Sequence, residues 1–204
     1  MDVGRWTSVP GYNMQTKPVQ IAVFASGSGS NARRLIGHFK NSPVAQVALV
    51  VSNKSDAGVL EIAREHNIPI HLISRHSFYE TEEILDILKE KLVDFVVLAG
   101  FLWLIPAYFV RAFPQKMVNI HPALLPKYGG KGMYGMRVHE AVKAAGEIET
   151  GITIHFVNEQ YDEGDTIFQA ICTLTPNDLP ADIARKVQQL EHHHFPEIIE
   201  NLVK

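Results

Sequence analysis

The sequence is poor in cysteine, in clustered basic charge and in long apolar runs. Its single cysteine, Cys172, excludes a disulfide framework and lies in an apolar run at 167–174, where a buried and unreactive thiol is expected. The 19 Lys and Arg residues against 22 Asp and Glu residues give a net charge of -3, which argues against a nucleic-acid-binding surface. The longest apolar stretch, 93–106, contains Asp94 and is too short to span a bilayer.

The N-terminus lacks the charged, apolar and small-residue sections of a signal peptide, and residues 1–18 show no hydrophobic period. We interpret residues 1–18 as a flexible extension and expect one domain at 19–204, because 204 residues with 46% hydrophobic content suffice for a single core. We expect a cytoplasmic protein whose partners are small molecules, with no role for nucleic acid or membrane. The sequence leaves monomer and homodimer open.

Buried-strand patterns alternate with helical patterns through the first two thirds of the chain. This alternation predicts a Rossmann-like α/β fold, a mostly parallel sheet with helices on both faces. The expected strands are 19–25, 44–52, 70–73, 95–99 and 117–120, and the expected helices are 31–40, 57–66, 78–92, 106–113 and 137–145. Strands at 150–157 and 166–174 follow each other closely, so the last part of the sheet is expected to be antiparallel. A final helix should begin near Pro180 and kink or break at Pro196.

The small-residue run Ser26-Gly-Ser-Gly-Ser-Asn31 follows the first expected strand and opens the first helix. Glycines let the backbone approach a ligand, and a helix start presents unpaired N–H groups, so Ser28, Gly29, Ser30 and Asn31 form a candidate phosphate site. With Ala32 the run also fits a relaxed dinucleotide fingerprint, although the next strand does not end in the acidic residue that this fingerprint uses. A tight turn with Asn31 as a helix cap is the alternative without a ligand.

A second candidate cluster is Asn119 and His121. Their side chains point to the same face because strand residues alternate, and they lie where open α/β sheets place ligands. An amide and an imidazole can both address one carbonyl oxygen, although a hydrogen-bonded structural histidine fits this position equally well. The acidic segment 158–165 is either a solvated turn or the source of a carboxylate that reaches His121.

Four segments, SGSGSN, VVLAGFLWLIP, NIHPALLPKYGG and GITIHFVNEQYDEG, occur in an order that resembles the glycinamide ribonucleotide formyltransferase family over about residues 19–200. This resemblance implies transfer of the formyl group of 10-formyltetrahydrofolate to the amine of 5-phosphoribosylglycinamide in purine synthesis, without a metal. It implies catalysis by Asn119, His121 and Asp162, with protonated His121 kept charged by Asp162. The implied ribonucleotide-binding residues are Ser28, Gly29, Ser30, Asn31 and Glu191, with Glu191 at the glycinamide amine. The implied folate-binding residues are Leu102, Trp103, Leu104, Ile105, Asn119, Asn158, Glu159, Gln160, Tyr161 and Asp162.

The sequence departs from the family pattern at two places. The resemblance implies a phosphate-binding arginine at the start of the third helix, where this chain has Thr81, and we expect Arg75 or a residue of the long loop at 128–137 to replace it. That loop is rich in Gly and Met, and it is either a lid or a surface insertion. The consecutive histidines 192–194 diverge on a helix, so we expect no metal site there.

Three alternatives remain. Methionyl-tRNA formyltransferases and formyltetrahydrofolate hydrolases share the catalytic core, but each carries a further domain for which we expect no room in 204 residues. A non-catalytic nucleotide-binding module would use the glycine loop alone and would leave Asn119, His121 and Asp162 unexplained.

Overall fold

The computed structural model describes residues 17–204, so the expected flexibility of residues 1–16 lies outside the described part. The strands are β1 (Val19–Phe24), β2 (Ala45–Ser52), β3 (Ile70–Leu72), β4 (Phe95–Leu98), β5 (Met117–His121), β6 (Glu149–Phe156) and β7 (Thr166–Thr173). The helices are α1 (Ser30–Phe39), α2 (Val59–Glu65), α3 (Arg75–Tyr79), α4 (Glu83–Glu90), α5 (Ala107–Ala112), α6 (Met136–Ala144) and α7 (Pro180–Val203).

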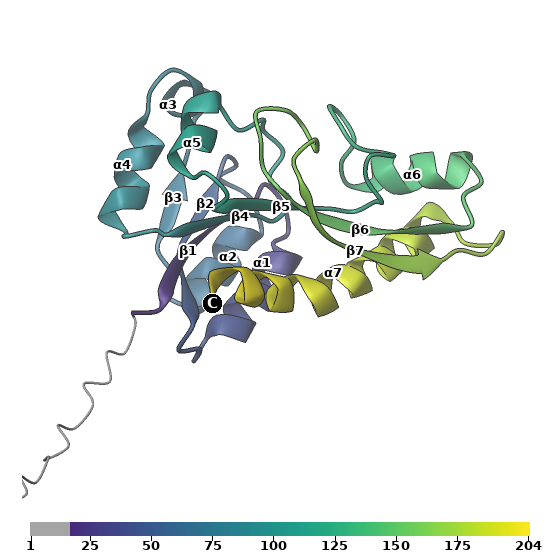
Figure 1. The fold of residues 1–204 in the computed structure, drawn as a ribbon, viewed down its shortest axis with the longest axis horizontal. Helices are drawn as coiled ribbons and strands as arrows, with labels where there is room; N and C mark the ends of the chain where they lie inside the picture. The colour runs from purple at the N-terminus through teal and green to yellow at the C-terminus, as the bar shows by residue number, and fades with distance from the viewer. Residues whose placement is uncertain (1–16) are drawn as a thin grey trace, which may run out of the picture.

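The strands form one seven-stranded sheet in the order β3-β2-β1-β4-β5-β6-β7 (Figure 1). β1 pairs in parallel with β2 and β4, and the pairs β2–β3 and β4–β5 are also parallel. β6 is antiparallel to both β5 and β7. The predicted fold class is therefore confirmed, including the antiparallel strands of the C-terminal part.

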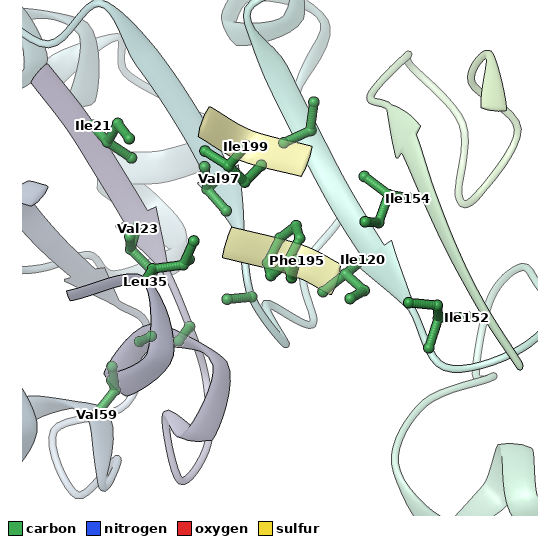
Figure 2. Close-up of a cluster of buried hydrophobic side chains, with 14 of the residues drawn as sticks. Ile21, Val23, Leu35, Val59, Val97, Ile120, Ile152, Ile154, Phe195 and Ile199 are labelled. Atoms are coloured by element: carbon green, nitrogen blue, oxygen red, sulfur yellow. The ribbon is translucent and has the colours of Figure 1, made fainter. Parts of the chain in front are cut away.

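Side chains of the central strands alternate between two hydrophobic cores. On one face Ile21 and Val97 belong to a core built with α1, α2 and α7 (Figure 2). On the other face Phe24 and Val96 belong to a core built with α3, α4 and α5. Burial on both faces explains why these strands read as continuous apolar runs.

Two predicted helices differ from the structure. The single helix expected at 78–92 is divided into α3 and α4. The Thr81 hydroxyl lies in the intervening turn, donates to the carbonyl of Ser77 at 2.7 Å and accepts from the N–H of Glu83 at 3.3 Å, so it satisfies backbone groups at both helix ends. Of the kink or break expected at Pro196, the break does not occur, because α7 runs through this buried proline to Val203.

The order in which successive strands are added to the sheet reverses direction at β1, which has β2 on one side and β4 on the other. Open α/β sheets bind ligands outside the carboxyl ends of the strands at such a point. The loops after β1 and β4 meet there, since the N–H of Ser26 donates to the carbonyl of Gly100 at 3.0 Å and its hydroxyl accepts from the N–H of Leu102 at 3.1 Å. No helix among residues 17–204 is long and apolar enough to cross a membrane.

Candidate active site

A cleft of about 740 Å³ opens at the carboxyl edge of the parallel strands. It is lined by Gly27 to Asn31 after β1, 99–102 after β4, 119–122 at the end of β5, 130–137 with His139, and Tyr161, Asp162, Ala184, Val187, Gln188 and Glu191. The glycine loop and the Asn119–His121 pair therefore face one cleft at one end of the sheet, as the alternating pattern predicted.

The glycine loop enters α1 through a left-handed residue. Gly29 has φ 78° and occupies the N-cap position without a side-chain cap. A Cβ at this position would lie 2.7 Å from the Cα of Val59, so close packing against α2 also requires the glycine. A Cβ on Gly27 would have no neighbour within 4 Å, which leaves space on the cleft side.

Asn31 binds a helix from the far end of the chain instead of capping its own. Its side-chain amide donates to Glu191 on α7 at 3.0 Å. Burial raises the pKa of the Glu191 carboxyl above its usual range. Gln188, one turn earlier on α7, donates weakly to the Ser30 hydroxyl at 3.4 Å and also lines the cleft. Gln188 was not among the predicted site residues, although its spacing of three residues from Glu191 places both on one helix face.

Asp162 is the centre of the polar cluster at the end of β5. Its Oδ1 accepts from the amide of Asn119 at 3.3 Å, and its Oδ2 accepts from the N–H of Gly130 at 2.9 Å. Oδ2 also lies 3.4 Å from Nδ1 of His121, and Oδ1 lies 3.6 Å from Nε2 of His155. The structure thus brings Asn119, His121 and Asp162 together.

His121 is buried between two oxygen atoms. Its Nε2 donates to the carbonyl of Tyr128 at 2.8 Å, and its Nδ1 faces Asp162. Burial lowers the pKa of His121 below its ordinary value, although the Asp162 charge and the Tyr128 carbonyl act in the opposite direction. The expectation that Asp162 keeps His121 charged, with a pKa above its ordinary value, is therefore wrong. For Asp162, burial acts to raise the pKa, but His155, His121 and the Gly130 N–H together lower it.

His155 is a second buried histidine of the cluster, to which the sequence analysis gave no role. Its Nδ1 donates to the carbonyl of Phe156 at 2.8 Å, so Nε2 is left to accept from the amide of Asn119 at 3.1 Å. Both amide hydrogens of Asn119 are thereby engaged, one by His155 and one by Asp162. His155 lies opposite Asn119 in the antiparallel pair of β5 and β6. The sequence shows only the alternation of the strand that contains His155, and the pairing itself comes from the fold.

A small hollow of about 50 Å³ adjoins the cleft at this cluster. Its lining includes Phe101, Trp103, Leu104, Ile105, Asn119, His155, Asn158, Gln160, Tyr161 and Asp162. Most of the residues expected to bind folate thus lie around one space. Leu102 lines the larger cleft instead. Glu159 lines neither; its exposed carboxylate lies 3.6 Å from Arg111.

The residues considered for phosphate binding differ in whether they line the cleft. Thr81 and Arg75 do not line it, and the Arg75 guanidinium stacks 5.1 Å from the centre of the Trp103 ring. Arg33 and Arg34 line a neighbouring hollow, which shares Ser28 and Ser30 with the cleft. Lys131 and Arg137, from the long loop and the start of α6, do line the cleft. Of the two expected substitutes for the phosphate-binding arginine, the loop at 128–137 therefore reaches the cleft and Arg75 does not.

Residues 17–204 contain no group of three or more His, Cys, Asp or Glu side chains that could hold a metal ion. The consecutive histidines 192–194 lie on α7 and belong to no such group.

Comparison with known proteins gives consistent matches. The formyl transferase family model matches residues 19–199. The chloroplastic phosphoribosylglycinamide formyltransferase of Arabidopsis thaliana is 42% identical over 197 residues, covering 94% of this chain and 68% of that protein. The trifunctional purine biosynthetic protein adenosine-3 of Drosophila melanogaster is 38% identical, covering 90% of this chain and 14% of that protein. The crystal structure of phosphoribosylglycinamide formyltransferase from Bacillus halodurans matches with a TM-score of 0.81 at 34% identity, covering 91% of this chain and 95% of that one.

Proposed function

Since this chain belongs to the formyl transferase family, we propose that its cleft transfers the formyl group of 10-formyltetrahydrofolate to the amine of 5-phosphoribosylglycinamide, a step of purine synthesis. The observation that carries the proposal is the position of Asn119 and Asp162, which line both the cleft and the adjoining hollow. The formyl group must pass from the folate to the ribonucleotide where the two binding spaces, the hollow and the cleft, meet. These two residues, with His121 beside them, stand at that junction.

The reaction requires stabilisation of a negative oxygen. The amine attacks the formyl carbon, the carbonyl oxygen becomes an oxyanion, and the bond from carbon to the folate nitrogen then breaks. Asn119 can donate to that oxygen by exchanging its longer bond, the one to Asp162 at 3.3 Å, while His155 keeps the other hydrogen. One such donor contributes about 3 kcal/mol to the transition state.

The reaction also moves one proton from the attacking amine to the departing folate nitrogen. In neutral His121 the Tyr128 carbonyl holds the hydrogen on Nε2, so Nδ1 is the basic atom and faces Asp162. Proton uptake at Nδ1, through a water that Asp162 orients, gives an imidazolium with an oxygen partner at each nitrogen. That cation supports the oxyanion and then releases the proton to the leaving nitrogen.

Ribonucleotide binding is assigned to the other end of the cleft. Ser28, Gly29, Ser30 and Asn31 present the start of α1 to the phosphate. Asn31 also holds the carboxylate of Glu191 at 3.0 Å, and in this proposal Glu191 contacts the glycinamide amine. The glycine loop supplies no cation. Lys131 and Arg137 line the same cleft and neutralise the phosphate charge in this proposal.

The folate pterin is assigned to Leu102, Trp103, Leu104 and Ile105 and to the loop from Asn158 to Asp162. We further propose a reaction without a metal, carried out by a monomer or homodimer on two small molecules. The Arabidopsis relative is named chloroplastic, so a cytoplasmic location for this chain is a separate proposal that cell fractionation of the full chain tests.

One assay tests the function. The protein is incubated with 10-formyl folate, and deformylation is followed by absorbance with and without 5-phosphoribosylglycinamide. Turnover only in the presence of the ribonucleotide is expected. Turnover independent of the amine would identify a hydrolase, and no turnover with either would identify a binding module.

A further inference from the structure

His139 is a buried imidazole in the cleft that the mechanism above does not use. It is 6% exposed and lines the same cleft as His121. Its Nδ1 is buried without a hydrogen-bond partner among residues 17–204. Buried polar groups in proteins nearly always have a partner, so this one points to a ligand.

The fold holds His139 firmly in this place. α6 begins directly after Gly135, whose φ of 55° turns the long loop into the helix. Val138 and Val142, one turn apart, are fully buried and anchor the helix beside His139. An unpaired buried imidazole on an anchored helix costs stability, and an apolar side chain would not carry this cost.

The neighbours of His139 identify the part of the ligand that it faces. Burial, and to a lesser extent the charge of His121, lowers the pKa of His139 and so favours the neutral imidazole, which can donate one hydrogen bond and accept another. His139 lines the same cleft as His121, and the end of that cleft at Asn119 and His121 is where the formyl group reacts in the proposed function. At that end the ribonucleotide presents its glycinamide group.

We propose that His139 is a positioning residue that hydrogen-bonds the glycinamide amide of the ribonucleotide and holds its amine toward the formyl carbon. This inference rests on the proposed function. It assigns His139 to the ribonucleotide and gives it no contact with the folate.

The test compares His139→Phe, which keeps a ring and removes both nitrogens, with His139→Gln, which keeps a polar group. The affinity for 5-phosphoribosylglycinamide is measured by calorimetry without folate, and kcat and both KM values are measured in the complete reaction. We expect His139→Phe to weaken ribonucleotide binding about 10- to 100-fold with an unchanged folate KM, and His139→Gln to restore part of the loss.

Two controls on the same helix separate positioning from stability. Glu140→Gln changes an exposed neighbour, and Val142→Ala loosens α6 without touching the imidazole. Ribonucleotide binding by His139→Phe equal to wild type would overturn the inference, as would the same loss of affinity in Val142→Ala. If wild type itself neither binds the ribonucleotide nor transfers formyl, the proposed function fails first.

Discussion

Replacing Asp162 by Asn removes the charge at the centre of the polar cluster with little change in shape. Asparagine also tolerates the positive φ of 57° at this position. Asp162 Oδ2 lies 3.4 Å from His121 Nδ1, and a fully charged pair at that distance attracts by about 5 kcal/mol at an effective dielectric constant of about 20. The cost of burial cancels part of this energy, so we take about 3 kcal/mol, which corresponds to a loss of about 100-fold in kcat.

The assay is steady-state formyl transfer with each substrate varied in turn. In Asp162→Asn we expect the fall in kcat with a nearly unchanged ribonucleotide KM, because the charge acts on the proton step and not on the phosphate. Asp165→Asn, the same chemical change on an exposed side chain nearby, is the matched control. The pKa of His121, followed by NMR, should fall further in Asp162→Asn because the opposing charge is lost.

A double-mutant cycle with His121 supplies the refutation. If His121 and Asp162 act together in one proton transfer, the double variant loses little more transition-state stabilisation than the worse single variant. Free-energy losses that simply add would show that His121 and Asp162 act independently, and a ribonucleotide KM that rises with kcat unchanged would show that Asp162 binds substrate instead.

Further predictions concern the phosphate site and pH. Gly27→Ala should raise the ribonucleotide KM with little change in Tm. Gly29→Ala should lower Tm, because its Cβ would lie 2.7 Å from the backbone of α2. The reverse pattern would contradict this description of the packing. Lys131→Gln and Arg137→Gln should each raise the ribonucleotide KM about tenfold and leave turnover of the phosphate-free riboside unchanged, and an equal effect on both substrates would refute their role. The free energy of unfolding should decrease as pH falls from 7 to 5. Burial holds the pKa of His121 below its value in the unfolded chain, so the unfolded chain takes up more protons over this range. Constant stability in denaturant titrations would contradict this.

The layout of the fold was predictable because its signals are local. Strand alternation and the turn after β1 are enough to predict that Gly29 and Asn119 lie at one edge of the sheet, as they do in the structure. The division between α3 and α4 was missed because the apolar period continues across it, while the Thr81 hydroxyl that satisfies the adjacent helix ends gives no periodic signal.

The details of the site depend on contacts between distant segments, which periodicity does not encode. Asn31 meets Glu191 across 160 residues, and Asp162 receives the N–H of Gly130 from the long loop. The direction of the His121 pKa shift depends on how completely its ring is buried, which spacing cannot show. Residue types and strand alternation therefore predicted Asn119 and His121, the family resemblance added Asp162, and tertiary packing determines the hydrogen bonding of the cluster and the place of His155 in it.

The most direct test of the account follows the formyl carbon itself. 10-Formyl folate carrying a ¹⁴C-labelled formyl group is mixed with excess protein in a single turnover, with and without 5-phosphoribosylglycinamide, and the products are separated. The account predicts that the label appears on the ribonucleotide when it is present and stays on the folate when it is absent. Label released as formate, with or without the ribonucleotide, would contradict it.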